Sequence, residues 1–97
     1  MAAYMIILAR VRDRVRFLQE YAAPAAALVA RFGGEYLVRS PRTRTLEGTL
    51  GEGWSSVVSK WPDRDSIERF WTSPDYAPLK AVRQGLADCH VLLVEEP

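Results

Sequence analysis

The sequence has 97 residues, the length of one small domain, and its 13 basic and 12 acidic side chains leave a net charge of +1. This balance argues against nucleic acid and against a membrane surface as partners. The single cysteine, Cys89, excludes a disulfide framework and the paired-cysteine spacings of redox and zinc sites. We therefore expect one domain over residues 1–97 with no metal site and no cofactor, and cytoplasmic by default.

The chain is rich in apolar residues for its size. Hydrophobic residues make up 48% of the sequence and include three tryptophans. A small domain that folds alone buries only a modest part of its surface and is therefore marginally stable. Such domains commonly gain stability by self-association. We therefore expect part of this apolar surface to contact a second copy of the chain.

The first predicted element is a strand over Tyr4–Val11, a run of branched and apolar residues too short for a lone helix. Alternation places two apolar sets on opposite faces, with Tyr4, Ile6 and Leu8 on one side and Met5, Ile7 and Ala9 on the other. One face can be covered by the helices of the domain. The other requires a second cover.

A helix is predicted next, with Asp13 as its N-cap and Gly33-Gly34 as its stop. Apolar side chains recur at steps of three and four along it. Pro24 lies inside the pattern and should kink or divide the helix near Tyr21, because proline lacks an N–H. The arginines at 10, 12, 14 and 16 flank its start and are interpreted as a solvated rim.

Two strands follow. The second strand begins at Glu35–Val38, and Arg44–Glu47 is predicted to continue it after an irregular stretch at Pro41. A glycine-rich turn leads to the third strand, Trp54–Trp61, in which Trp54 and Val58 share one face and Val57 and Trp61 the other.

The second helical region begins at Pro62-Asp63 and is interrupted at Ser73-Pro74, a strong signal for a restart. A last strand is predicted over Cys89–Glu95. The order β-α-β-β-α-β predicts a ferredoxin-like α+β fold, a four-stranded antiparallel sheet with its helices on one face. Two such sheets can close face to face about a two-fold axis, which predicts a homodimer.

Five segments, in chain order, resemble motifs of domain-of-unknown-function family 1330 (DUF1330). They are FGGEYLVR at residues 32–39, TLEG at 45–48, FWTSPDY at 70–76, LKAVR at 79–83 and VLLVE at 91–95. The resemblance implies the dimeric α/β-barrel superfamily, in which two sheets form one barrel. That superfamily includes cofactor-independent monooxygenases, lactone isomerases and simple binding proteins, and fold alone does not choose among them.

Two residues are candidate catalytic groups. Glu47 matches a family motif and is a candidate base if burial raises its pKa, and the alternatives are a structural ion pair with Arg39 or two solvated strand residues. His90 is the only histidine and is a candidate general base near neutral pH, and the alternative is an ordinary strand histidine.

Four residues are candidate ligand-binding groups. Arg39 and Arg83 match family motif positions and are suited to binding an anion, although an arginine late in a helix also answers the helix dipole. Trp54 and Tyr76 belong to the aromatic set suited to lining an apolar pocket, with packing as the alternative.

These residues support two functional hypotheses. In the first, a homodimeric barrel binds a small organic molecule, or acts on it without a cofactor, in a pocket between sheet and helices. In the second, the dimer is an accessory module without chemistry of its own. The sequence leaves open whether the protein is an enzyme.

Overall fold

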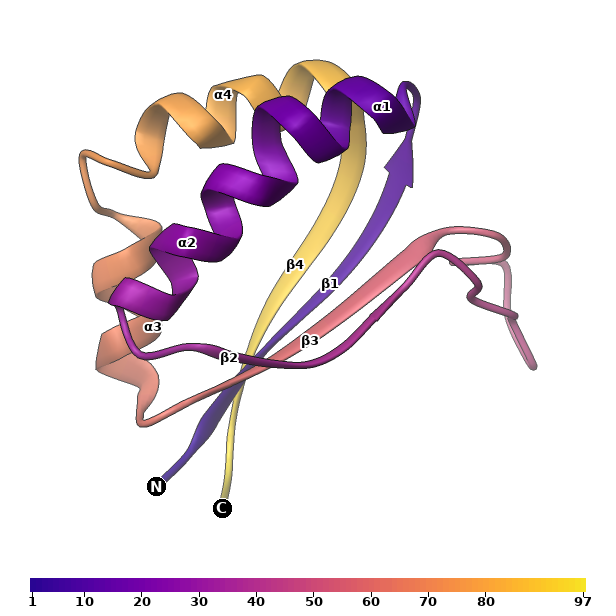
Figure 1. Ribbon diagram of the computed structural model, residues 1–97. Helices are drawn as coiled ribbons and strands as arrows, with labels where there is room; N and C mark the ends of the chain where they lie inside the picture. Colours follow the sequence, from indigo (N-terminus) through magenta and orange to yellow (C-terminus); the bar gives the residue numbers. More distant parts are fainter.

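The computed structural model describes all residues, Met1–Pro97, and its helices cover one face of a four-stranded sheet (Figure 1). The elements in order are β1 (Ala3–Val11), α1 (Arg14–Phe17), η1 (Leu18–Ala22), α2 (Ala23–Arg31), β2 (Glu35–Ser40), β3 (Ser55–Trp61), α3 (Arg64–Trp71), α4 (Ala77–Leu86) and β4 (Ala87–Glu95). The strands pair in the order β2-β3-β1-β4, all antiparallel. The predicted ferredoxin-like fold is confirmed, and within one chain the sheet is open rather than closed into a barrel. None of the helices has the length and apolar character needed to span a membrane.

The first helix is continuous but changes its winding where the break was predicted. Its start is capped by Asp13, whose Oδ1 accepts a hydrogen bond from the Arg16 N–H at 3.1 Å. The turn over η1 is a π-helix, in which the Ala23 N–H donates to the Leu18 carbonyl. Pro24 has no N–H for the regular ladder, and the wider turn precedes it. Tyr21 lies in this π turn, and its side chain is buried against the sheet side.

The second helical region is divided into α3 and α4, as predicted. Asp63 caps α3 by accepting a hydrogen bond from the Ser66 N–H at 2.8 Å. Between the two helices, the Ser73 hydroxyl oxygen accepts a hydrogen bond from the Tyr76 N–H at 3.1 Å. This turn places Tyr76 in the core, where it is 2% exposed.

The hydrophobic core lies between the sheet and the helices. Trp61 is 1% exposed, and its Nε1–H donates to the Ser59 hydroxyl at 2.8 Å. Its ring packs against Phe70 of α3, with 5.3 Å between ring centroids. The buried cluster consists of Ala3, Met5, Tyr21, Ala25, Leu28, Val29, Trp61, Ile67, Phe70 and Tyr76.

The other face of the sheet is open and apolar. Val38 pairs with Val58, Val58 with Ile6, and Ile6 with Leu92, so one row of apolar side chains crosses all four strands. Leu92 is 55% exposed and Val38 is 49% exposed. This set, which we call the apolar row, confirms the predicted alternation of β1 and leaves the face without a cover in one chain.

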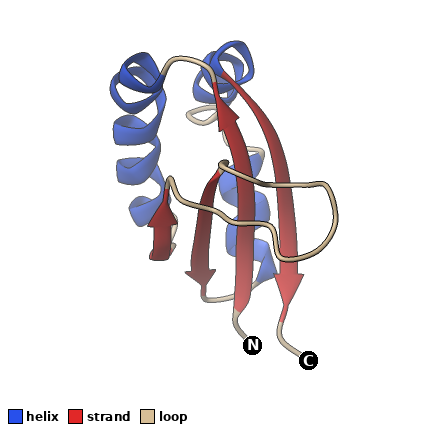
Figure 2. Cartoon of the chain, turned by 90° about the vertical axis from the view of Figure 1, so that its right-hand side faces the viewer, coloured by secondary structure: helices blue, strands red, loops and turns tan.

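Residues 41–54 form a long loop, so the predicted continuation of β2 over Arg44–Glu47 is wrong. Strand β2 ends at Ser40, immediately before Pro41, which cannot donate to a ladder. The loop forms its own hydrogen bonds instead, including Gly53 N–H to the Thr43 carbonyl at 2.8 Å. Figure 2 shows the loop crossing the open face of the sheet. Gly51 is buried there, and a Cβ at that position would lie 4.0 Å from a Leu8 methyl group.

A bulge in β2 changes which face its side chains occupy. Tyr36 pairs with Ser59 while Val38 pairs with Val58, so Leu37 is an extra residue without a partner. Arg39 therefore lies opposite Val57, on the face that the helices cover. Its guanidinium packs over the Tyr36 ring, 4.4 Å from the ring centroid. In a regular strand these two side chains would point to opposite faces.

Replacing Asp63 with alanine should reduce thermal stability at neutral pH. The hydrogen bond from the Ser66 backbone holds the pKa of Asp63 below its ordinary value. A lowered folded-state pKa stabilises the fold above the ordinary carboxyl pKa, and this contribution is lost as the pH falls through the lowered value. Melting temperatures from pH 7 to pH 2.5 should therefore converge for wild type and Asp63→Ala in acid. Asp65→Asn, one turn into the same helix, is the control and should follow wild type throughout.

Candidate functional site

A small cavity of about 80 Å³ lies between the sheet and the first helix. Its apolar walls come from β1, β3, η1 and α2. Its polar or reactive side chains come from four elements and a helical turn, and are Tyr21, Tyr36, Arg39, Ser55, Arg83 and Cys89. The inner cavity alone has room for a few waters or one small chemical group.

The inner cavity opens into a larger hollow of about 390 Å³ at the end of β2. The two share five lining residues, Phe17, Ala22, Arg39, Ser55 and Val57. Arg14 joins the lining of the outer hollow, and its Nη2 donates to the Ser55 hydroxyl at 3.0 Å. We group the two adjoining hollows as the helix–sheet pocket, which in total is of a size that suits a small organic ligand.

The helix–sheet pocket is strongly cationic. Arg14, Arg39 and Arg83 line it, and no aspartate or glutamate does. None of the three arginines is among the ion pairs of the chain, which use other arginines. Guanidinium groups stay charged at neutral pH and offer planar pairs of donors to carboxylates and phosphates. A lining of this charge is chemically suited to an anion.

Two tyrosines add neutral hydrogen-bond donors. The hydroxyls of Tyr21 and Tyr76 lie 2.7 Å apart and share a hydrogen bond. Burial, and then the neighbouring Tyr76, raise the pKa of Tyr21 well above its ordinary value. Burial also raises the pKa of Tyr36, partly offset by the charge of Arg39. Both groups remain phenols at physiological pH, so they donate hydrogen bonds and do not act as bases.

The structure brings three of the sequence-predicted residues to this pocket. Arg39 and Arg83 line it directly, from β2 and α4. Tyr76 lies beneath it and reaches it only through its hydrogen bond to Tyr21.

Glu47, Trp54 and His90 do not line the helix–sheet pocket, contrary to the prediction. Ser55 faces the helices, so Trp54 next to it faces the open side, where its ring stacks on His90 at 5.8 Å between centroids. His90 pairs with Leu8 and is exposed on that same open face. Glu47 is exposed in the long loop and forms no ion pair with Arg39. The period of two along the strands is the physical reason for the separation.

Sequence reasoning missed Arg14 and Ser55 as pocket residues. Arg14 was interpreted as part of a solvated rim, yet it follows the helix cap Asp13 and is directed back toward β3. The available signal was the two-residue spacing of Ser55 and Val57, which places both side chains on the helix-covered face.

Comparisons with known proteins place the chain in a family and support the fold. Among curated protein sequences, none matches this chain. A protein of unknown function from Rhodopseudomonas palustris has a similar structure, with a TM-score of 0.79 and 18% identity over 99% of this chain and 82% of that chain. A dimeric ferredoxin-like protein of unknown function from Jannaschia sp. gives a TM-score of 0.76 and 12% identity over 99% of this chain and 100% of the other.

An enzyme of known type is also similar in structure. SnoaB, a cofactor-independent oxygenase from Streptomyces nogalater, gives a TM-score of 0.71 and 20% identity, covering 99% of this chain and 93% of SnoaB. At these identities the likenesses establish the fold alone. The sequence model for the domain of unknown function DUF1330 matches residues 2–97. Because this match spans nearly the whole chain, the protein belongs to the DUF1330 family.

Proposed function

We propose that this protein is a homodimer that binds a small organic anion, such as an aryl carboxylate or an enolate, in the helix–sheet pocket. The observation that carries this proposal is the lining, which holds three arginines outside any ion pair and no carboxylate. Arg39, stacked on Tyr36, lines both the inner cavity and the outer hollow, so we expect it to contact an anion bound in either.

The same lining bears on the chemistry. The pocket supplies cations and phenol donors, which stabilise negative charge on oxygen. It holds neither a carboxylate nor an imidazole to take a proton. This favours binding over acid–base catalysis by the protein. The similarity to SnoaB, a cofactor-independent oxygenase, extends the proposal to a ligand that enters already ionised, as an enolate, whose negative charge the arginines hold.

Two observations support the homodimer. The apolar row crosses the whole open face of the sheet, and exposed apolar patches of this kind mark interfaces. Structural neighbours from Jannaschia sp. and Bacteroides fragilis are described as dimeric. In the proposed dimer the two open faces pack together, and Trp54 and His90 lie at the interface and not in the ligand site.

Arg39→Ala should weaken binding of aryl carboxylates by about 10-fold or more, because a hydrogen bond to a charged group contributes about 1.5–3 kcal/mol. The measurement is a titration of wild type and variant with benzoate and 2-naphthoate, followed by NMR shifts of pocket residues. Arg44→Ala, an exposed arginine in the long loop, is the matched control and should bind as wild type does.

The neutral amides of the same acids complete the experiment. Benzamide and 2-naphthamide should bind wild type more weakly than the acids, by a margin that Arg39→Ala removes. Equal binding of acid and amide, or an Arg39→Ala variant indistinguishable from Arg44→Ala, would reject the anion site. That result would favour the alternative, an accessory module without a ligand of its own.

A further inference from the structure

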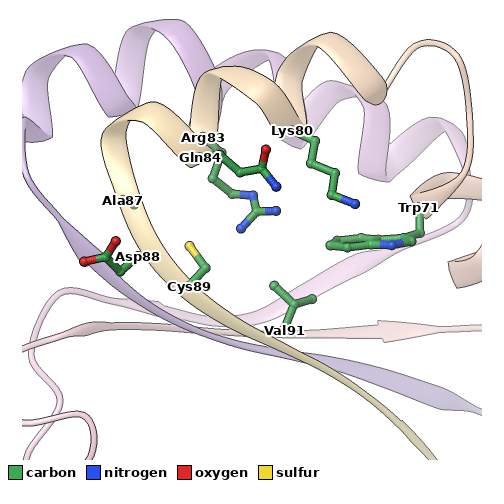
Figure 3. A pocket seen from close by; sticks show the side chains of 8 residues that line it. All are labelled: Trp71, Lys80, Arg83, Gln84, Ala87, Asp88, Cys89 and Val91. Atoms are coloured by element: carbon green, nitrogen blue, oxygen red, sulfur yellow. The ribbon is translucent and has the colours of Figure 1, made fainter.

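A second hollow, of about 470 Å³, lies on the far side of Arg83 from the helix–sheet pocket, between α4 and β4 (Figure 3). We propose that this α4–β4 cleft is a separate site for a small oxyanion, a phosphate or carboxylate group. The site is distinct from the pocket of the proposed function, since Lys80, Gln84 and Trp71 line the cleft and not that pocket, although Arg83 and Cys89 border both.

Two cations converge in the cleft. Lys80 and Arg83 are three residues apart on α4 and therefore share one face of that helix. The Lys80 Nζ lies 4.4 Å from the centroid of the Trp71 ring, and the Arg83 Cζ lies 5.8 Å from the same centroid. Neither side chain belongs to an ion pair. In Figure 3 the ammonium and guanidinium groups both end in the hollow above Val91.

Arg83 has an unmet hydrogen-bonding group. The residue is 6% exposed, and its Nε is the one buried side-chain polar atom without a hydrogen-bond partner. A buried donor left without an acceptor destabilises the fold, more so when it is charged. The accessible part of the same guanidinium lines the cleft, and a guanidinium fixed by burial is well suited to bind an oxyanion there.

The acidic residue of the cleft does not compete for these cations. Asp88 is held by Arg10 Nη2 at 2.6 Å and by Arg12 Nη1 at 2.8 Å. Figure 3 shows it at the opposite end of the cleft from Trp71 and Lys80. Its charge is therefore already balanced, which leaves the Lys80 and Arg83 end cationic. The Gln84 amide also projects into the hollow and offers a neutral donor.

The two lysines of the chain provide an internal control. Lys80 lines the cleft, whereas Lys60 is exposed on the open face of the sheet at the end of β3. Labelling lysine with ¹³C at Cε therefore gives two signals, one for each site. Titration with inorganic phosphate, at ionic strength held constant with sodium chloride, should shift the Lys80 signal saturably and leave Lys60 unchanged. Equal shifts of both signals, or no saturable shift of Lys80, would overturn the proposal.

Matched variants test the site and identify the source of the anion. Lys80→Gln, which lacks the Lys80 signal and is followed by the Gln84 side-chain amide shift instead, should weaken phosphate binding by about 10-fold from the loss of one charge-assisted hydrogen bond, and Lys60→Gln should not change it. Tighter binding of phenyl phosphate than of inorganic phosphate identifies an organic phosphate, and equal binding identifies the free ion. Arg39→Ala should keep phosphate binding at Lys80 even while it loses aryl carboxylates, so failure of either site is seen separately. A Lys80→Gln variant that binds phosphate as tightly as wild type contradicts the proposal.

Discussion

Leu92→Lys should convert the proposed dimer into a folded monomer. Leu92 ends the apolar row and is 55% exposed in the single chain, so a lysine there has access to water before association. In a dimer closed through the open faces, the same ammonium is buried without a partner, at a cost of several kcal/mol. The two-fold axis places two such charges in one interface, so the dissociation constant should rise by more than about 100-fold. Native mass spectrometry and light scattering at micromolar concentration measure the change directly.

Val15→Lys is the matched control for this substitution. Val15 is also an exposed apolar residue, at 65%, but it lies on α1 in the helical layer, away from the open face of the sheet. This variant should remain dimeric. A wild-type monomer, or a Leu92→Lys dimer as tight as that of Val15→Lys, would contradict the face-to-face arrangement while leaving the fold of the single chain unaffected.

Gly34→Ala should destabilise the protein strongly. A Cβ at this position would lie 2.6 Å from Val29 Cγ1 and 2.7 Å from Trp61 Cζ2. Both neighbours are buried, at 5% and 1% exposure, so neither can move without disturbing the core. Forcing one methyl group into a packed core costs about 1–3 kcal/mol. Chemical denaturation should show the loss as a lower midpoint with an unchanged slope.

Gly85→Ala is the control within the same chain. Gly85 lies in α4, and an added Cβ there would have no atom within 4 Å. Alanine is the better helix former, so this variant should gain about 0.5–1 kcal/mol. Equal effects of the two substitutions, in either direction, would show that close packing of Gly34 against Trp61 is not what requires glycine there.

The fold was largely predictable because its signals are local. Alternation in β1, the caps Asp13 and Asp63, and the Ser73-Pro74 break each depend on residues close together in the chain. The predicted strand at Arg44–Glu47 failed because β2 stops before Pro41, and the loop residues bond to one another instead. A single sequence does not reveal whether the backbone groups of such a segment form hydrogen bonds with a neighbouring strand or within the loop.

The candidate site was less predictable because it depends on which face of its strand each residue occupies and on contacts between residues far apart in the sequence. The pocket arginines Arg39 and Arg83 were identified, but Trp54 and His90 were expected on the wrong face of the sheet. Their stacking across β3, β1 and β4 depends on the register between strands far apart in the sequence. Arg14 was assigned to a solvated rim because its contact with Ser55 spans 41 residues.

The face of the sheet on which Arg39 lies depends on whether Leu37 pairs with β3. Without Leu37, regular pairing from Tyr36 and Ser59 would set Val38 opposite Val58 and Arg39 opposite Val57, as the bulge does here. With Leu37 present and paired regularly, the arginine would lie opposite Ser56 on the open face. Among relatives of equal length, a second strand that pairs without the bulge would therefore carry the arginine from one side of the sheet to the other while every neighbouring residue is kept. An aligned arginine column is then evidence of an equivalent pocket only where the bulge is aligned as well.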